Sequence, residues 1–385
     1  MVQAVAVEDL CEGLFVVALE NAKGRLRVNK PGRIHSIDLI NQIKTNGIKT
    51  VWVDFELSDL SFYVPDRHLR NPKPPKTTSM DTERIRAESI LVKSKDLLSK
   101  AIDNLYEGKN IDIAPIADLS ESIVDSIRCN PDAIHCVAAL RSKDSYLLEH
   151  SLNVAFLMVS FGRHLGLNQQ VLKQLAIGGL LHDIGKTQVK LEVLNKPARL
   201  TPEEFEHMKL HQVLSEPLLD CIPGLSDMSR QVSLLHHEKL DGSGYPRGLY
   251  GDEISLVGRM SAIVDIYDAL TATRCYKQSM SPTAAFKILK SMTPKQLDGE
   301  LLNEFIRNIG VYPVGSLVEL SDNRAGLVWE SNDTSFLQPV VKCFYSLKYG
   351  RYSDIEMVNL ADRTDLAIER GLSPGKENID PTPYR

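Results

Sequence analysis

The cysteines of this chain form none of the patterns that bind structural zinc or build a disulfide framework. There are six among 385 residues, they are scattered, and no two stand in a Cys-x-x-Cys pair. Such usage suits a reducing compartment, where isolated thiols persist. The N-terminus also lacks a basic segment, and acidic residues interrupt its apolar stretch. We therefore expect no secretory signal peptide.

Long hydrophobic runs and an excess of positive charge are lacking as well. The most apolar windows, near residues 154–161 and 172–181, fall well short of the roughly 20 residues that span a bilayer, so we expect no membrane span. The net charge of -5 argues against binding of a nucleic-acid polymer and against a general membrane patch. An anionic substrate would have to be held by local positive groups.

The first part of the chain, residues 1–63, is expected to form a small α+β domain. Residues 13–19 and 48–54 are rich in β-branched and aromatic side chains, as strands are, and residues 37–43 fit a short helix between them. The next part, residues 64–80, contains four prolines. A proline cluster of this kind predicts an extended linker.

Helical periodicity begins at residue 81 and predicts a connecting or interface helix over residues 81–114. Apolar side chains recur there at spacings of three, four and seven. They are Leu91, Leu98, Ala101, Ile102 and Leu105. These residues fit either the seam of a coiled-coil-like dimer or a helix packed on its own domain. The second alternative is favoured, because fewer than three clean heptads are present.

The rest of the chain divides into a helical part and a β-rich part. Residues 115–310 alternate amphipathic helices with short loops, which predicts an all-α domain. One helix start is explicit: Thr201 is a capping residue, Pro202 follows, and Glu204 stands three positions after the cap. Residues 311–370 predict a small β-rich segment, and the prolines of residues 371–385 predict a flexible tail. The fold class is therefore mainly α.

Histidines and acids gather in the helical part. Residues 182–186 read His-Asp-Ile-Gly-Lys, and residues 236–246 read His-His-Glu-Lys-Leu-Asp-Gly-Ser-Gly-Tyr-Pro. One histidine beside apolar residues is usually a satisfied core residue. Five or six of them, each next to a core-facing helix segment and with acids nearby, favour a site for a borderline divalent metal. Spacing leaves open the choice between His207 and His211, and between Asp265 and Asp268.

These two strings resemble the signatures of HD-GYP domains, which are bacterial phosphodiesterases that hydrolyse cyclic dinucleotides, most often cyclic di-GMP. The resemblance covers residues 115–310, and the N-terminal part resembles the small uncharacterised domain that often precedes such domains. It implies a cytoplasmic bacterial enzyme of HD-type helical fold. Its substrate would be cyclic di-GMP or 3′3′-cyclic GMP-AMP and its product a linear dinucleotide. A homodimer and a cyclase partner are also compatible with it.

The resemblance also implies a ligand set for two metal ions. One ion would be held by His150, His182 and Asp265, the other by His211, His236 and His237, with Asp183 as the bridge. His207 and Asp268 would then lie outside the set. Nitrogen and oxygen ligands without thiolate suit iron or manganese, with zinc, nickel or magnesium as alternatives.

A third metal is not expected. Some family members bind one through a glutamate one helical turn before the first histidine, and that position is Tyr146 here. Tyrosine is a poor ligand for such a site. Asp144 or Glu149 could in principle substitute for the glutamate, but neither is a full turn from His150.

The hypothesis for the reaction is attack of a metal-bridging hydroxide on a phosphorus of the substrate. Asp183 and Lys186 are the catalytic residues in this interpretation. The residues expected to contact substrate are Lys186, Gly244, Tyr245, Pro246, Arg274 and Lys277. The Gly-Tyr-Pro turn would close the metal pocket, shape the substrate site or offer a partner surface. Cys275 stands where the family commonly has proline, a departure that affects the local turn but not the charges.

Two other functions compete with this hypothesis. A non-catalytic receptor or adaptor would act through the Gly-Tyr-Pro loop, as suggested by degenerate family members that lose metal ligands. This chain keeps every ligand position and Lys186, which argues for the enzyme. A one-metal HD-domain phosphohydrolase would not need His211, His236 and His237.

Overall fold

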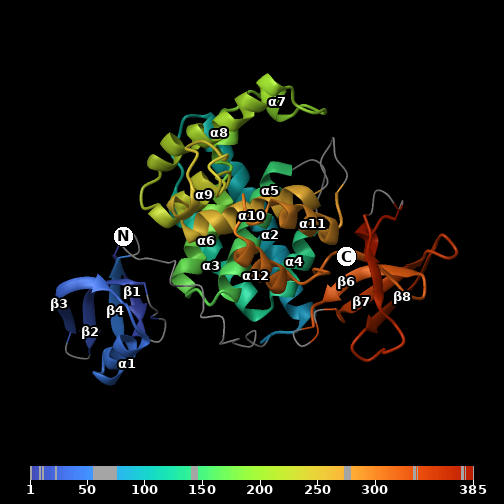
Figure 1. Cartoon of the computed structure of the whole chain (residues 1–385), viewed down its shortest axis with the longest axis horizontal. Helices are drawn as coiled ribbons and strands as arrows, with labels where there is room; N and C mark the ends of the chain where they lie inside the picture. The colour runs from blue at the N-terminus through green and yellow to red at the C-terminus, as the bar shows by residue number, and fades with distance from the viewer. Residues whose placement is uncertain are drawn as a thin grey trace.

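The computed structural model describes the chain except for residues 1, 8–9, 11–12, 22–23, 55–75, 140–145, 273–278, 333–334, 336, 374–376, 378 and 385. A helical body occupies the middle of the molecule, and a β-sheet lies at either end of it (Figure 1). The N-terminal sheet and the C-terminal sheet are thus separated by the helices. None of the helices in the described part of the chain is both long and apolar enough to cross a membrane.

The N-terminal part is a four-stranded antiparallel sheet with one helix. Its elements are β1 (Val2–Ala6), β2 (Phe15–Asn21), β3 (Gly24–Arg33), α1 (Ile37–Thr45) and β4 (Thr50–Asp54), and the strand order is β1-β4-β2-β3. The predicted strands at 13–19 and 48–54 and the short helix between them are confirmed. Strands β1 and β3 were not expected. Val51 and Val53 of the inner strand β4 and Leu14, just before β2, are fully buried in the core of this part.

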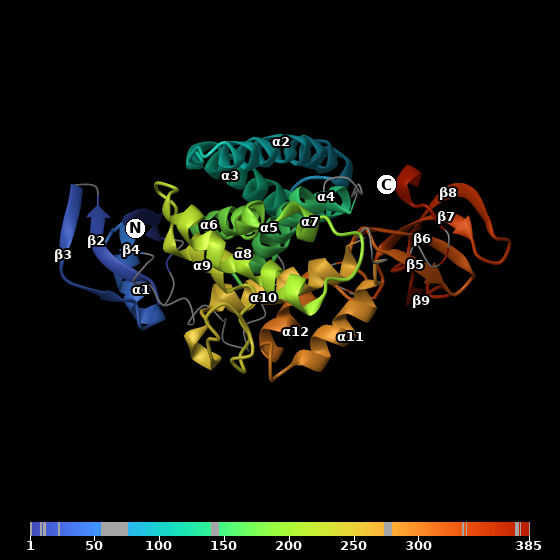
Figure 2. The same ribbon diagram turned by 90° about the horizontal axis from the view of Figure 1, so that it is seen from above.

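The helical body begins with one long helix and a second that runs beside it. These are α2 (Met80–Tyr106) and α3 (Ile113–Cys129), and they lie along one side of the other helices (Figure 2). For residues 81–114 the sequence left two alternatives, the seam of a dimer or a helix packed on its own domain. The structure decides between them for two side chains. Leu98 and Ala101 are buried in the core of their own domain, because α2 packs against α3, α4 and α5. Because they are buried there, these two side chains give no support to the predicted homodimer.

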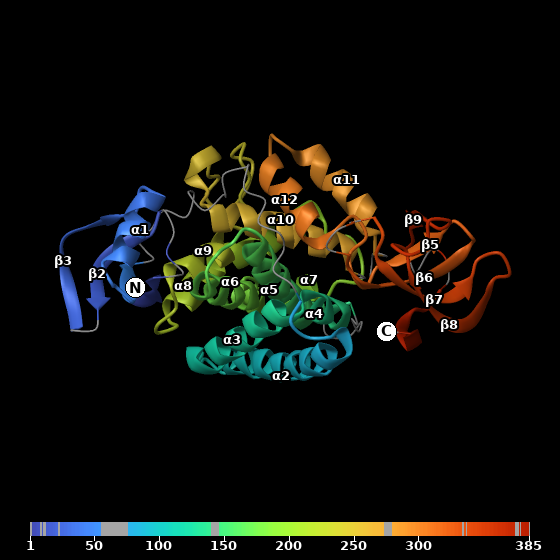
Figure 3. The ribbon, with the colours of Figure 1, turned by 90° about the horizontal axis from the view of Figure 1, so that it is seen from below.

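The side chains of α5 lie at the centre of the core, where α6, α10 and α12 pack against it. The remaining elements of the helical body are α4 (Pro131–Ala138), α5 (Tyr146–His164), α6 (Gln169–Leu181), η3 (Ile184–Gln188), α7 (Leu191–Leu194), α8 (Pro202–Asp220), α9 (Asp227–Leu235), η4 (Gly251–Glu253), α10 (Leu256–Thr271), α11 (Pro282–Met292) and α12 (Gly299–Ile309). Helices α11 and α12 lie on the side opposite α2 (Figure 3). Phe156 and Phe161 of α5 and Phe305 of α12 are completely buried. The predicted start of α8 is confirmed, since Thr201 and Glu204 form a reciprocal capping box.

The C-terminal part is a five-stranded antiparallel sheet with the order β8-β7-β6-β5-β9. Its elements are β5 (Leu317–Leu320), β6 (Arg324–Glu330), β7 (Val340–Ser346), β8 (Arg351–Asn359), β9 (Ile368–Gly371) and the short η5 (Thr382–Tyr384). The expectation of a flexible tail over residues 371–385 needs correction. Leu372 and Ile379 are buried against this sheet, and the ring of Tyr384 stacks on Phe344 with centroids 4.2 Å apart. Apolar contact therefore holds the described part of the tail in place.

A buried carboxylate joins three segments that are distant in the sequence. Asp132, at the start of α4, forms an ion pair with Lys76 at 2.7 Å. It also accepts hydrogen bonds from the backbone nitrogen and the hydroxyl group of Ser331, at 2.7 and 2.8 Å. The C-terminal sheet is thereby fixed to the helical body next to the point where the described chain enters α2.

Candidate metal centre

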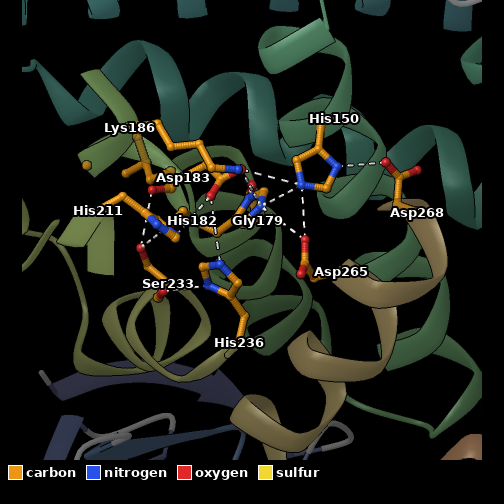
Figure 4. Close-up of polar contacts among 12 residues, drawn as sticks. His150, Gly179, His182, Asp183, Lys186, His211, Ser233, His236, Asp265 and Asp268 are labelled. Atoms are coloured by element: carbon orange, nitrogen blue, oxygen red, sulfur yellow. Dashed lines mark hydrogen bonds and ion pairs between the residues drawn. The ribbon is translucent and has the colours of Figure 1, made fainter. Parts of the chain in front are cut away.

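Five helices or helix ends bring histidines and acids to one buried point. The residues with ligand atoms close to one another are His150 of α5, His182 and Asp183 after α6, His211 of α8, His236 and His237 after α9, and Asp265 of α10. Figure 4 shows four of the imidazoles and Asp265 gathered around Asp183. These seven are the residues that the resemblance selects as ligands.

Three of the histidines are oriented by the same local contact. In each, Nδ1 lies within hydrogen-bonding distance of the carbonyl oxygen three residues earlier in the chain. The pairs are His182 with Gly179 (2.8 Å), His211 with Met208 (2.6 Å) and His236 with Ser233 (2.7 Å). A carbonyl only accepts, so Nδ1 carries the proton and the lone pair of Nε2 faces inward. An inward lone pair is what a metal ion requires of histidine.

Asp183 has the geometry of a bridge between two groups of histidines. Its Oδ2 lies 3.4 Å from Nε2 of His150 and 3.3 Å from Nε2 of His182. Its Oδ1 lies 3.5 Å from Nε2 of His211 and 3.8 Å from Nε2 of His236. One carboxylate thus turns one oxygen to each half of the cluster.

The charge of Asp183 is maintained although the residue is buried. Burial would raise the pKa of its carboxyl, but the charge of Lys186 holds that pKa well below its usual range. Its Oδ1 is buried and has no hydrogen-bond partner among the described residues. A buried ionised oxygen without a partner is costly. A bound cation would satisfy it.

The first histidine, His150, is held from two sides by carboxylates of α10. Its Nε2 lies 3.0 Å from Oδ1 of Asp265, and its Nδ1 lies 2.7 Å from Oδ2 of Asp268. Asn153 donates a hydrogen bond of 2.9 Å to the other oxygen of Asp268. The sequence could not distinguish Asp265 from Asp268. The structure gives them different positions: Asp265 lies among the candidate ligands, and Asp268 holds the far side of the ring.

The histidine pKa values differ between the two halves. Burial lowers the pKa of His150, but its hydrogen bonds to Asp265 and Asp268 outweigh this and raise it to about 9. Burial lowers the pKa of His211 to about 4 and that of His237 to about 3. The His211 half is therefore neutral near pH 7 and already has the form that binds metal. At His150 a metal ion must displace a proton.

Gln212 is a buried neighbour of the cluster that the sequence did not reveal. Its side-chain amide lies 3.0 Å from Nε2 of both His211 and His236. Glutamine is not among the usual ligands of such metals, and the ligand pattern therefore gave no reason to select it.

The Gly-Tyr-Pro turn packs directly on this cluster. The ring of Tyr245 stacks on His237 with centroids 4.6 Å apart. Glu238 is buried and accepts hydrogen bonds from the backbone nitrogens of Arg247 and Leu249, at 2.8 and 3.0 Å. A Cβ atom at Gly244 would lie 2.4 Å from the backbone nitrogen of Lys239. Only glycine therefore permits this turn to close over the histidines.

A second glycine allows η3 to approach α8. A Cβ atom at Gly185 would lie 2.0 Å from the carbonyl oxygen of His211, and the Gly185 nitrogen donates to the hydroxyl of Ser215 at 3.0 Å. This approach holds Lys186 beside the cluster. Its Nζ lies 2.5 Å from Oδ2 of Asp183, and 17% of its side chain is exposed. A cation that both touches the bridge and reaches solvent can contact an anionic substrate.

Some of the predicted site residues lie outside the part of the chain that the structure describes. Arg274 and Lys277, with the neighbouring Cys275, lie outside the described residues. Tyr146 is the first residue of α5, and its side chain is likewise not described. Glu149, a nearby carboxylate, forms an ion pair with Lys95 at 2.6 Å.

Replacing Asp268 by Asn should weaken metal binding without removing a ligand. The variant keeps the size of the side chain but loses the charge that holds Nδ1 of His150. Loss of such a supporting contact typically costs about 10- to 100-fold in metal affinity. Titration against a competing chelator would measure the change. Unaltered affinity in a folded Asp268→Asn protein would show that Asp268 does not support His150 in this way.

The donor set fits divalent cations. It contains imidazole nitrogens and carboxylate oxygens but no thiolate, a combination suited to iron, manganese or zinc. The two oxygens of Asp183 face separate histidine groups, and Oδ1 is buried without a hydrogen-bond partner among the described residues.

Comparison with known proteins agrees with this geometry. A family model described as an HD domain matches residues 136–301, and a domain of unknown function (DUF3391) matches residues 2–116. A cyclic di-GMP phosphodiesterase of Pseudomonas aeruginosa is 33% identical over 349 residues, which cover 88% of this chain and 83% of that protein. A 3′3′-cGAMP-specific phosphodiesterase of Vibrio cholerae is 37% identical over 179 residues, or 46% of this chain and 41% of the relative.

A solved structure has the same fold over most of the chain. It is an HDG"Y"P protein from Bdellovibrio bacteriovorus, with a TM-score of 0.50, 14% sequence identity, and coverage of 79% of this chain and 98% of that one. At this identity the likeness concerns the fold alone.

Proposed function

The chain belongs to the HD-GYP family of cyclic-dinucleotide phosphodiesterases, and we propose that its helical domain cleaves such a substrate with two divalent metal ions. It is a hydrolase of cyclic dinucleotides. The observation that carries the two-metal proposal is the position of Asp183, each of whose oxygens faces a different pair of histidines.

The two ions would be held by different residues. His150, His182 and Asp265 would hold one ion, and His211, His236 and His237 the other, with Asp183 shared between them. Support for this division comes from the distances around Asp183. The ligand atoms of His211, His236 and His237 lie close together, and those of His150, His182 and Asp265 lie 3.0–3.9 Å apart. A shared carboxylate suits ions about 3.5–4 Å apart, as in two-metal hydrolases. Iron or manganese is proposed, since both accept imidazole and carboxylate ligands.

The chain's own residues would bind and orient the scissile phosphate. Lys186 would donate to a non-bridging phosphoryl oxygen and offset the charge that develops there. Tyr245 would line the wall of the site; burial raises the pKa of its hydroxyl, so the group stays neutral and can donate. The two ions, when bound, would activate the attacking water and neutralise phosphoryl charge. Arg274 and Lys277 remain proposed phosphate contacts.

The proposed substrate is cyclic di-GMP or 3′3′-cyclic GMP-AMP, and the proposed product is the linear dinucleotide. The names of the relatives support both substrates, since one acts on cyclic di-GMP and another on 3′3′-cGAMP. A homodimer, a cyclase partner and a cytoplasmic location stay predictions.

Metal analysis combined with a hydrolysis assay tests the proposal. We expect two ions per chain after purification with iron or manganese, and a linear dinucleotide as the product resolved by chromatography. Three tightly bound ions would contradict the two-metal proposal. A metal-loaded protein that binds but does not hydrolyse either dinucleotide would instead be a receptor.

A further inference from the structure

A row of aromatic rings and one lysine leads from the candidate metal centre to the surface. Tyr245 stacks on His237, and Nζ of Lys209 lies 5.6 Å from the centre of the Tyr245 ring. The same Nζ lies 5.1 Å from the centre of the Phe205 ring. Phe205 and Lys209 belong to α8, whereas Tyr245 belongs to the Gly-Tyr-Pro turn. Two separate segments therefore place their rings around one ammonium group.

Phe205 is exposed, although it is large and apolar. Its exposed fraction is 48%. The contact with Lys209, four residues later, is of a kind that helix surfaces often show by themselves. Tyr245 is not explained by that spacing, because it reaches Lys209 from another segment that is fixed on His237. The exposed ring thus continues a surface that starts at the candidate ligands.

The charge of Lys209 is available to an anion. Its present partner is Glu206, at 2.7 Å, and 69% of the Glu206 side chain is exposed. An ion pair with so exposed a partner contributes little, so a phosphate can replace the carboxylate at small cost. With Lys186 beside Asp183, the described part of the site has one cation next to the metal ligands and a second beyond the Tyr245 ring.

This arrangement matches the chemistry of a cyclic dinucleotide. Such a molecule carries two phosphates in its ring and two flat bases outside it. Bases stack on aromatic side chains in many nucleic-acid-binding proteins, and lysine pairs with phosphate. If one phosphate lies at the metal centre, the other phosphate and a base must lie elsewhere on the protein.

We propose that Phe205 and Lys209 form a subsite for the part of the substrate that is not cleaved. Phe205 stacks on a purine base, and Lys209 contacts the second phosphate. The inference rests on the proposed function, since it assumes a cyclic dinucleotide at this metal centre. It assigns substrate binding to α8, outside the two sequence motifs.

The test compares two substrates in Phe205→Ala. The first is a cyclic dinucleotide, and the second is bis(p-nitrophenyl) phosphate, a small diester with neither purine nor second phosphate. We expect KM for the cyclic dinucleotide to rise about 5- to 100-fold, as for loss of one base stack, with kcat little changed. Hydrolysis of the small diester should not change. Phe205→Trp keeps an aromatic ring at this position, so its KM should stay near the wild-type value.

Lys209→Met examines the phosphate contact separately. It should raise KM for the cyclic dinucleotide and weaken the dependence of KM on salt, because one phosphate contact is lost. Leu210→Ala serves as the matched control. Leu210 is also exposed on α8, at 44%, but lies about 140° around the helix from Phe205. It should leave both substrates unaffected.

The results distinguish a failure of the proposed subsite from a failure of the proposed function. If wild type cleaves the cyclic dinucleotide and Phe205→Ala leaves its KM unchanged, the subsite is wrong while the proposed function stands. If Phe205→Ala impairs both substrates equally, Phe205 supports the fold of the site and the subsite is again wrong. If metal-loaded wild type cleaves the small diester but no cyclic dinucleotide, the proposed function itself fails.

Discussion

Replacement of Asp183 by Asn should abolish hydrolysis and reduce the metal content of the protein. The carboxylate turns one oxygen to His150 and His182 and the other to His211 and His236. An amide offers one weaker acceptor and no negative charge, so it cannot neutralise two cations. Activity should fall by more than the roughly 10²–10³-fold that follows loss of one electrostatic contact in an active site.

Two measurements on one preparation check this expectation. Metal content should fall below that of wild type, and turnover of the cyclic dinucleotide and of bis(p-nitrophenyl) phosphate should fall together. Asp118→Asn is a suitable control, because Asp118 is exposed on α3. A folded Asp183→Asn protein that keeps two ions and near-wild-type turnover would exclude the bridging role.

Much of the fold followed from local sequence patterns, but some strands depend on their partners. The capping box of Thr201 and Glu204 is a local signal, and it marked the start of α8 correctly. Strand β3 contains Pro31, Gly32 and several charged residues, which do not favour a strand by themselves. Its pairing with β2 makes this segment a strand. Propensity gives no information on such tertiary pairing.

The conformation of the C-terminal tail, residues 371–385, could not be predicted for a different reason. Prolines near the end of a chain suggest flexibility, and composition cannot show what a few apolar side chains will find to pack against. Ile379 is buried and Tyr384 stacks on Phe344, because the β-rich segment offers an apolar face at that place. That face exists only after β5–β9 have assembled.

The candidate metal ligands could be predicted because histidine and aspartate recur in the helical part. The residues that only contact those ligands were harder to predict. Asp265 and Asp268 are three residues apart, so both lie on the same side of α10 and spacing cannot rank them. They contact opposite nitrogens of one ring, that of His150. Gln212 contacts two candidate ligands, yet nothing in its neighbouring sequence distinguishes it from a glutamine on a helix surface.

Replacement of Lys186 by Met should reduce turnover while leaving the metal ions in place. The ammonium group is 2.5 Å from Oδ2 of Asp183 and partly exposed, so it can reach a phosphoryl oxygen of a substrate held at the centre. Methionine keeps much of the length of the side chain and removes its charge. Loss of one such contact to developing charge typically costs about 10²–10³-fold in kcat.

The prediction separates Lys186 from both Asp183 and Phe205. Turnover of the cyclic dinucleotide and of bis(p-nitrophenyl) phosphate should fall alike, because both contain a phosphodiester, whereas Phe205→Ala should affect the nucleotide alone. Metal content should stay at the wild-type value, unlike that of Asp183→Asn. Lys190→Met, which removes an exposed lysine four residues later, is the matched control and should be neutral. Loss of metal from Lys186→Met would mean that this lysine acts by holding the Asp183 carboxylate, since its charge lowers the pKa of that group, and would remove it from direct contact with the substrate.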